Sequence, residues 1–266
     1  MISRVFGATG ERVAVIGQGT WRMGEDRATA KEEIAALRLG IELGLTHIDT
    51  AEMYGDGGAE RIVAQAVAGQ RDKVFIATKV LPSNASYAGT LRACEQSLKR
   101  LKTDYVDLYL LHWWSNQHPI GETLRAMEEL VARGAARFIG VSNFDVAQIE
   151  AAQAVLRRER LACNQVLYHL RDRAIEQATL PYCEKQDIAS VGYTPLAKGG
   201  FQRGVVADIA NRHGRTPRQV ALNFLTRRAS LFTIPKASRP EHVRENAGAL
   251  DFRLTPEDRK AIEVGL

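Results

Sequence analysis

Residues Val106–Leu111 read VDLYLL, an apolar run that ends at His112. The run lacks strict apolar–polar alternation, which is typical of a parallel strand covered on both faces. Similar runs recur along the chain, and most begin roughly 26 to 32 residues apart, the length of one strand and one helix. The other runs are Val13–Gly17, Leu45–Ile48, Val74–Thr78, Arg137–Val141, Ala162–Val166, Ala189–Tyr193 and Leu231–Ile234. This repetition predicts an α/β fold, a closed (β/α)8 barrel of the TIM type.

The whole chain, residues 1–266, is expected to form one domain. A parallel barrel with its helices typically needs about 250 residues, and no low-complexity segment or linker divides the sequence. Residues 5–13 predict a β-hairpin before the barrel, which we expect to plug its N-terminal end. Residues 205–227 hold two helical patterns, which predicts extra helices near the C-terminus and explains the longer gap before the last strand.

Several helix ends can be predicted from local residue patterns. Residues 28–43 carry apolar side chains at helical spacing and stop at Gly44. Thr216 and Thr255 each place a capping hydroxyl before a proline at the first helical position. Residues Ser238–Glu241 fit a capping box directly after the last predicted strand.

Charge and cysteine content narrow the classes of function. The formal net charge is +5, but Lys and Arg are scattered and no RNP, zinc-finger or helix-turn-helix signature occurs, so we expect no nucleic-acid partner. No apolar run approaches the roughly 18 residues of a membrane span, and the first residues lack the apolar stretch of a signal peptide. The three cysteines form no CxxC pair, which favours a reduced cytoplasmic protein without a zinc site.

Polar and aromatic residues gather where the predicted strands end. In such barrels the functional residues lie at the C-terminal ends of the strands, so these side chains are expected to face one common mouth. In chain order they are Gly19, Thr20, Trp21, Asp49, Tyr54, Lys79, His112, Trp113, Trp114, Ser142, Asn143, Gln165, Tyr193 and Lys236.

Some of these residues have a simpler explanation when taken alone. Asp49 can cap a turn, Lys79 can end a strand in solvent, and His112 can be a core histidine. Tyr54 can pack against its glycine-rich loop. However, an unpaired buried charge is costly, so their joint occurrence at strand ends favours a shared site.

Four of these residues suit one chemistry. A phenol with a pKa near 10 is a poor acid–base group at neutral pH, and a nearby ammonium lowers that pKa. Lys79 can supply the ammonium, Asp49 can hold it charged, and His112 can donate a hydrogen bond to a substrate carbonyl. Tyr54 can then protonate the carbonyl oxygen as a hydride arrives at carbon. Trp21, Trp113 and Trp114, with Tyr54 and His112, are expected to line the substrate pocket.

The sequence resembles the aldo-keto reductase family over essentially its whole length. The matching segments occur in order, and together they are highly specific. They are Gly17–Trp21, His47–Gly55, Ile76–Val80, Val106–His112, Ile139–Phe144, Asn164–Gln165, Tyr193–Leu196 and Ile234–Lys236. The resemblance implies an NADPH-dependent reductase of small carbonyl compounds whose catalytic tetrad is Asp49, Tyr54, Lys79 and His112.

The resemblance also implies a set of cofactor contacts. Ser142, Asn143 and Gln165 would hydrogen-bond the nicotinamide carboxamide, and Tyr193 would stack on the ring. Residues Leu196–Gly199 would lie along the pyrophosphate. The remaining implied cofactor residues are Gly19, Thr20, Trp21 and Asp49 near the mouth, Lys236, Ser238 and Arg239 at the adenosine 2'-phosphate, His242 beside them, and Glu245 and Asn246 at the adenine.

Two departures from the family pattern affect specificity. His242 stands where many NADPH-preferring members carry arginine, and a neutral imidazole binds phosphate less well than a guanidinium. Lys236 and Arg239 still favour NADPH, but use of NADH stays open. The chain also ends just after the last predicted helix, without the longer tail of members with narrow substrate range. We therefore expect an open pocket that accepts short aldehydes, α-dicarbonyls or keto sugars.

Other functions fit the sequence less well. A Rossmann dehydrogenase needs a third glycine where Arg22 stands. A barrel lyase that forms a Schiff base on Lys79 is an alternative, but Asp49 would keep that lysine protonated and a poor nucleophile. A non-catalytic NADPH-sensing subunit is a second alternative, and the complete tetrad argues against it. Nothing in the sequence requires more than a monomer.

Overall fold

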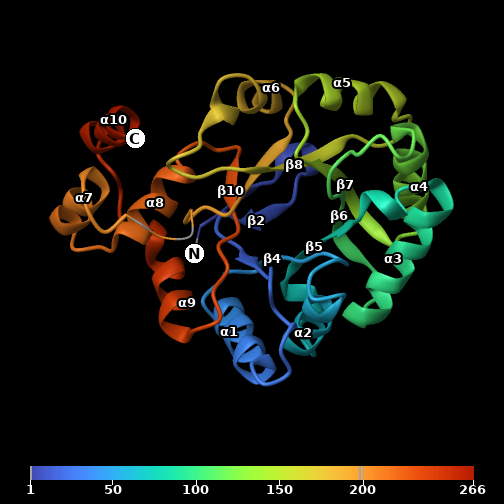
Figure 1. The fold of residues 1–266 in the computed structure, drawn as a ribbon, viewed down its shortest axis with the longest axis horizontal. Helices are drawn as coiled ribbons and strands as arrows, with labels where there is room; N and C mark the ends of the chain where they lie inside the picture. Colours follow the sequence, from blue (N-terminus) through green and yellow to red (C-terminus); the bar gives the residue numbers. More distant parts are fainter. Residues whose placement is uncertain (1, 198, 200) are drawn as a thin grey trace.

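The computed structural model describes residues 2–197, 199 and 201–266 and shows a ring of parallel strands surrounded by helices (Figure 1). The strand order in the main sheet is β10-β9-β8-β7-β6-β5-β4-β3, and every neighbouring pair is parallel. The strands are β3 (Gln18–Gly19), β4 (His47–Asp49), β5 (Phe75–Val80), β6 (Val106–Leu111), β7 (Ala136–Ser142), β8 (Leu161–Leu167), β9 (Ala189–Tyr193) and β10 (Leu231–Thr233). The predicted (β/α)8 fold is confirmed.

The ring closes between the first and last strands. Ile16 forms a parallel bridge with Thr233, and Gly19 forms one with Lys236. Gly19 is required at this closure because a Cβ atom there would lie 2.6 Å from the backbone oxygen of Ile234. Closure leaves the strand interiors buried on both faces, which is why β5 and β6 are buried at every position.

The first predicted strand does not form as one unit. Residues 13–17 straddle the end of β2 (Arg12–Ala14), which belongs to the hairpin, and the approach to β3. These residues pair with two different partners. Val13 pairs with Arg4 in the hairpin, whereas the Val15 carbonyl accepts a hydrogen bond from the Thr233 amide of β10. The other predicted strands agree with the structure to within two residues at each end, and the ranges predicted for β6 and β9 match the observed ones.

Helices cover the outside of the strand ring (Figure 1). They are α1 (Ala30–Glu42), α2 (Gly58–Ala66), α3 (Tyr87–Leu101), α4 (Ile120–Ala132), α5 (Val146–Val155), α6 (Thr179–Lys185), α7 (Val205–His213), α8 (Pro217–Leu225), α9 (Pro240–Ala247) and α10 (Pro256–Gly265). The two helices predicted within residues 205–227 are α7 and α8, and α10 packs against α7 at one side of the ring. Within the described ranges, none of these helices has the length and apolarity that a membrane span requires.

Two of the three predicted helix caps are present. Thr216 caps α8 and Thr255 caps α10, each through a capping box with a proline in the first turn. The capping box predicted at Ser238–Glu241 is wrong, because Arg239 is the N-cap of α9 and its side chain makes no capping hydrogen bond. The Ser238 hydroxyl instead accepts a hydrogen bond from Lys236 Nζ at 3.1 Å.

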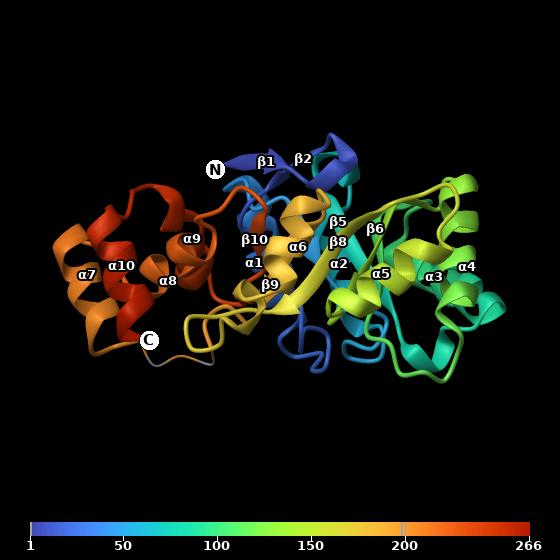
Figure 2. The ribbon, with the colours of Figure 1, turned by 90° about the horizontal axis from the view of Figure 1, so that it is seen from above.

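A hairpin closes the N-terminal end of the barrel. Strands β1 (Ser3–Val5) and β2 pair antiparallel and lie across one end of the ring, as Figure 2 shows. Phe6 is fully buried, with its ring 5.3 Å from that of Phe75, 4.9 Å from that of Phe232 and 6.0 Å from that of His47. The hairpin is therefore the predicted plug, and the mouth at the opposite end stays open.

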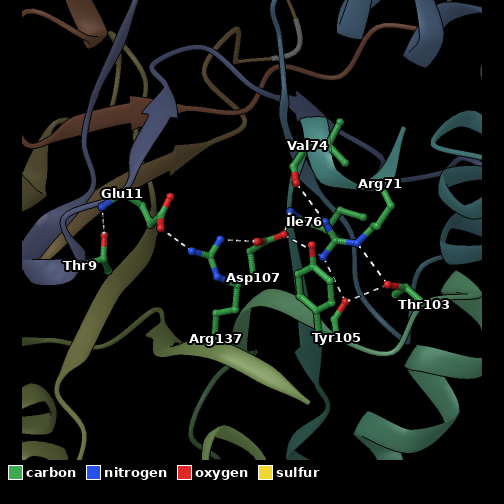
Figure 3. Close-up of polar contacts among 9 residues, drawn as sticks. All are labelled: Thr9, Glu11, Arg71, Val74, Ile76, Thr103, Tyr105, Asp107 and Arg137. Carbon is green, nitrogen blue, oxygen red and sulfur yellow. Dashed lines mark hydrogen bonds and ion pairs between the residues drawn. The ribbon is translucent and has the colours of Figure 1, made fainter. Parts of the chain in front are cut away.

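A buried carboxylate joins the hairpin to the barrel at this closed end (Figure 3). Asp107 of β6 accepts hydrogen bonds from Arg71 Nη2 at 2.8 Å, from the Ile76 amide at 2.9 Å and from Arg137 Nη1 at 2.9 Å. Arg137 also forms an ion pair with Glu11 of the hairpin. These partners compensate a charge that would otherwise be costly to bury.

His47 is buried beside the same plug without polar compensation. Its side chain is fully buried, and neither ring nitrogen has a hydrogen-bond partner among the described residues. Burial lowers the pKa of His47 to about 4, because the apolar surroundings disfavour the imidazolium. The folded protein therefore binds this proton less readily than the unfolded chain.

Replacing His47 by leucine should flatten the acid dependence of stability. Between pH 6.5 and the folded pKa of about 4, the unfolded chain binds a proton that the folded protein rejects, so stability falls as the pH falls. The loss amounts to about 3 kcal/mol once it is complete. Urea unfolding at pH 7.0, 5.5 and 4.5 should show a smaller decline for His47→Leu than for the wild type. Equal declines would contradict this account.

Candidate active site

A cavity of about 580 Å³ opens at the C-terminal mouth of the barrel. Most of the residues predicted at strand ends lie in its wall. Those that line it are Gly19, Trp21, Asp49, Tyr54, His112, Trp113, Ser142, Asn143, Gln165, Tyr193, Leu196, Gly199 and Lys236. The convergence expected from the sequence is therefore present in the structure.

An ion pair between neighbouring strands lies beneath this cavity. Lys79 of β5 is fully buried, and its Nζ lies 2.8 Å from Asp49 Oδ1 and 2.8 Å from Oδ2 at the end of β4. Lys79 Nζ also donates to the Thr50 carbonyl oxygen at 2.8 Å. Burial alone would lower the pKa of Lys79, but the negative charge of Asp49 and the hydrogen bonds to Asp49 and Tyr54 outweigh it and raise that pKa. Lys79 is thus held as an ammonium.

The ammonium contacts the phenol of Tyr54. Lys79 Nζ lies 3.2 Å from Tyr54 Oη, and a turn after β4, in which the Tyr54 amide donates to the Ala51 carbonyl, presents the ring to the cavity. Burial raises the pKa of Tyr54 above its ordinary value, whereas Lys79 lowers it and Asp49 raises it. The sequence-based expectation of a lowered pKa is therefore wrong in its net direction, because burial outweighs the ammonium. The phenol is accordingly protonated at neutral pH.

His112, which follows β6, stands beside the phenol. The two rings are 5.7 Å apart between centroids and nearly perpendicular. Burial, with the charge of Lys79, lowers the pKa of His112 to about 3, so the imidazole is neutral at physiological pH. Its Nδ1 atom is buried without a hydrogen-bond partner among the described residues. A neutral imidazole is a hydrogen-bond donor through one of its two nitrogens.

Asn143 connects several strand ends in the wall of the cavity. Its backbone has a positive φ of 62°, a conformation that asparagine tolerates better than most residues. Its side chain donates to the His112 carbonyl oxygen at 3.1 Å and to Ser142 Oγ at 3.1 Å, and it accepts from Tyr193 Oη at 2.8 Å. These contacts connect the ends of β6, β7 and β9.

Gln165 and Thr20 support Asp49. Gln165 Nε2 donates to Asp49 Oδ1 at 2.7 Å, and the Thr20 hydroxyl donates to the Asp49 backbone oxygen at 2.9 Å. Both residues are buried. Sequence resemblance assigned both to the cofactor; in the structure Gln165 contacts the carboxylate that holds Lys79, and Thr20 contacts the backbone of Asp49.

The three tryptophans expected at the substrate pocket separate into two groups. Trp21 and Trp113 line the cavity and remain 51% and 37% exposed, so they form an open aromatic rim together with Met53. Trp114 is not among the residues that line the cavity. Its ring stacks on Phe144 at 6.2 Å between centroids and packs against the core outside the strands. Adjacent residues in this loop point to different sides.

The predicted adenosine subsite is only partly joined to the cavity. Lys236 lies in the cavity wall with Leu196 and Gly199, while Lys198 falls outside the described residues. The other predicted residues of this subsite lie around the start of α9 or within it, beyond the lining residues; they are Ser238, Arg239, His242, Glu245 and Asn246.

Some lining residues were missed by the sequence analysis. Met53 is adjacent to Tyr54, and Thr194 and Pro195 follow β9, so strand-end position alone was a usable signal for these three. Arg218 was not predictable in this way. It belongs to α8, far from any strand end, and reaches the cavity through the packing of α8 on α9.

Comparison with known proteins agrees with this geometry. The sequence profile of the Aldo/keto reductase family matches residues 15–264. The chain belongs to the aldo/keto reductase family. Methylglyoxal reductase YeaE of Escherichia coli (strain K12) is 48% identical over 246 residues, which cover 90% of this chain and 86% of that protein. The chain is accordingly an oxidoreductase of a family that acts on carbonyl groups.

Further aldo/keto reductases extend the similarity. Glyoxal reductase of Bacillus subtilis (strain 168) is 34% identical over 234 residues, covering 88% of this chain and 83% of that protein. The crystal structure of an aldo-keto reductase from Klebsiella pneumoniae in complex with NADPH superposes with a TM-score of 0.95 at 45% identity. That similarity covers 99% of this chain and 95% of the crystallised one.

The neutral state of His112 can be tested by NMR. Because burial lowers its pKa to about 3, the imidazole signals of His112, assigned with a His112→Gln variant, should not titrate between pH 8 and pH 4.5. A midpoint near 6.5, the ordinary histidine value, would show that the ring is solvated or paired with an acid and would contradict the described site.

Proposed function

We propose that this aldo/keto reductase reduces small aldehydes and ketones to alcohols with NADPH, and that Tyr54 donates the proton. The contact between the buried ammonium of Lys79 and the phenol of Tyr54, 3.2 Å apart, is the observation that carries the proposal. A phenol that is protonated at neutral pH and touches a fixed cation can release its proton when an alkoxide forms beside it.

The cofactor assignment rests on the relatives and on the shape of the site. The similar reductase from Klebsiella pneumoniae was crystallised with NADPH. In this chain the cavity extends from Tyr54 and His112 to Lys236, and thus runs from the predicted nicotinamide contacts to the first of the predicted adenosine contacts. Asn246, expected at the adenine, has a buried Oδ1 without a hydrogen-bond partner among the described residues. An acceptor left in that state suits a bound donor such as an adenine amino group.

The residues of the tetrad divide the chemistry among them. When bound, the nicotinamide supplies the hydride that reduces the carbonyl carbon. His112 donates a hydrogen bond to the carbonyl oxygen and so orients the substrate. Tyr54 transfers its proton to the same oxygen. Lys79 stabilises the resulting phenolate, and Asp49, supported by Gln165, keeps Lys79 charged and in place.

The substrate class follows from the rim of the cavity and from the relatives. Trp21 and Trp113 are exposed at the mouth, which leaves it open to small molecules. Two similar proteins are a methylglyoxal reductase and a glyoxal reductase. We infer that short α-dicarbonyls are among the substrates of this chain.

We also propose that residues 1–266 form a single domain that acts as a monomer.

We also propose that the protein acts in the cytoplasm. Cys94, Cys163 and Cys183 are all buried free thiols, as expected in a reducing compartment.

The structure does not favour the alternative functions. A Schiff-base lyase needs an unprotonated, accessible lysine, whereas Lys79 is fully buried and its pKa is raised by Asp49 and Tyr54. A non-catalytic sensing subunit does not require the tetrad, whose Asp49, Tyr54 and His112 line the cavity above Lys79.

Replacing Tyr54 by phenylalanine should remove reduction without removing cofactor binding. Loss of a general acid typically lowers turnover by about 100- to 10,000-fold. NADPH oxidation with methylglyoxal should fall by this amount, while NADPH binding followed by fluorescence stays within a few-fold of the wild type. Tyr109→Phe is the matched control, because that phenol lies buried in β6 away from the cavity, and its variant should keep turnover.

Retained turnover in the Tyr54→Phe variant would mean that another group supplies the proton. Covalent trapping of a keto substrate on Lys79 by borohydride would instead support the lyase.

A further inference from the structure

Arg218 is a cation in the cavity wall for which the sequence analysis gave no role. It is the second residue of α8 and lines the cavity together with Lys236, Leu196 and Gly199. Among the described lining residues, Arg218 and Lys236 are those with a positively charged side chain at neutral pH. Arg218 belongs to α8, whereas Lys236 lies in the connection between β10 and α9, so the two cations reach the cavity from different segments. Helices α8 and α9 pack side by side here (Figure 1).

The position of Arg218 within its helix is electrostatically unfavourable. The first turn of a helix carries a partial positive charge and is stabilised by anions rather than cations. The first turn of α8 contains no acidic residue that would offset the arginine. Helix stability therefore does not account for Arg218, and an anion bound outside α8 would offset this unfavourable charge.

Glu245 of α9 is an anionic neighbour of Arg218, but its contact leaves most of the guanidinium unused. The distance from Arg218 Nη1 to Glu245 Oε2 is 3.4 Å, long for a charge-assisted hydrogen bond, and both side chains are partly exposed, at 31% and 17%. A guanidinium has five N–H donors in a fixed fork, and this contact uses one of them. The remaining donors can bind a second anion without breaking up the pair.

The adenosine end of the cavity lacks a guanidinium where the family resemblance expects one. His242 stands at that position, and it is not among the residues that line the cavity. Arg239 is 70% exposed and lies 3.7 Å from Glu241, so its charge faces solvent. Among the cations expected at the 2'-phosphate, Lys236 is the one in the described cavity wall, and a phosphate monoester carries about 1.5 to 2 negative charges near pH 7.

We propose that Arg218 determines cofactor specificity: together with Lys236 it binds the adenosine 2'-phosphate of NADPH, and so replaces the missing arginine at position 242. This inference rests on the proposed function, because it assumes a dinucleotide in the cavity. Arg218 reaches the phosphate from α8, while Glu245 keeps the guanidinium near the adenosine before the cofactor arrives.

Calorimetric binding of NADP+ and NAD+ to the whole protein tests the proposal without requiring turnover. For Arg218→Gln we expect the affinity for NADP+ to fall about 10- to 100-fold, the typical effect of losing a charge-assisted hydrogen bond. The affinity for NAD+ should change less than about threefold, because NAD+ lacks the 2'-phosphate. Arg218→Lys should recover part of the loss, since it keeps the charge but not the fork.

Two controls keep the outcomes separate. Arg244→Gln removes one exposed positive charge from α9, next to Glu245, and should leave both affinities unchanged. Lys236→Ala is the reference for loss of a phosphate contact and should resemble Arg218→Gln. Unfolding curves should confirm that the Arg218 variants are folded.

Two outcomes for Arg218→Gln would contradict the proposal. Equal losses for NADP+ and NAD+ in Arg218→Gln would place the residue at the pyrophosphate or in the scaffold. Unchanged affinity for NADP+ would remove it from the subsite altogether. Failure of the wild type to bind NADP+ would instead defeat the proposed function itself, which distinguishes the two failures.

Discussion

The site depends on one buried ion pair, the contact of Lys79 with Asp49 at the ends of two adjacent strands. A buried ammonium is costly unless a counter-charge and further hydrogen bonds surround it. Here the carboxylate, the Thr50 carbonyl and the Tyr54 hydroxyl provide that environment. Gln165 reaches across the barrel to hold the carboxylate, so β4, β5 and β8 all converge on one charge. The same charge touches the phenol that we propose as the proton donor.

The two ends of the barrel differ in how they use polar groups. At the closed end, the Asp107 carboxylate is matched by two arginines and a backbone amide, and aromatic packing around Phe6 excludes solvent. At the open end, His112 and Tyr54 keep polar atoms directed at a cavity, and both are neutral at physiological pH because burial disfavours their charged forms. The closed end is thus filled by packing and ion pairs, and the reactive groups lie at the open end.

The sequence predicted the fold because each strand is a buried apolar run and these runs recur at a regular spacing along the chain. The ranges predicted for β6 and β9 match the structure. The prediction failed at residues 13–17, where pairing with β10 and with the hairpin, rather than local pattern, sets the strand ends. The cavity residues that follow strands were predictable from position alone. Three features could not be predicted, because each depends on packing between distant segments. They are the side to which Trp114 points, the net direction of the Tyr54 pKa shift and the presence of Arg218 of α8 in the cavity wall.

A double-mutant cycle on Lys79 and Tyr54 tests most directly whether the ammonium and the phenol act as one unit. The turnover of NADPH with methylglyoxal would be measured for Lys79→Met, Tyr54→Phe and the double variant. Because the lysine is proposed to act only through the phenol, the double variant should lose little more activity than the more damaging single one. Losses that multiply would show that the two groups act independently and would contradict the account.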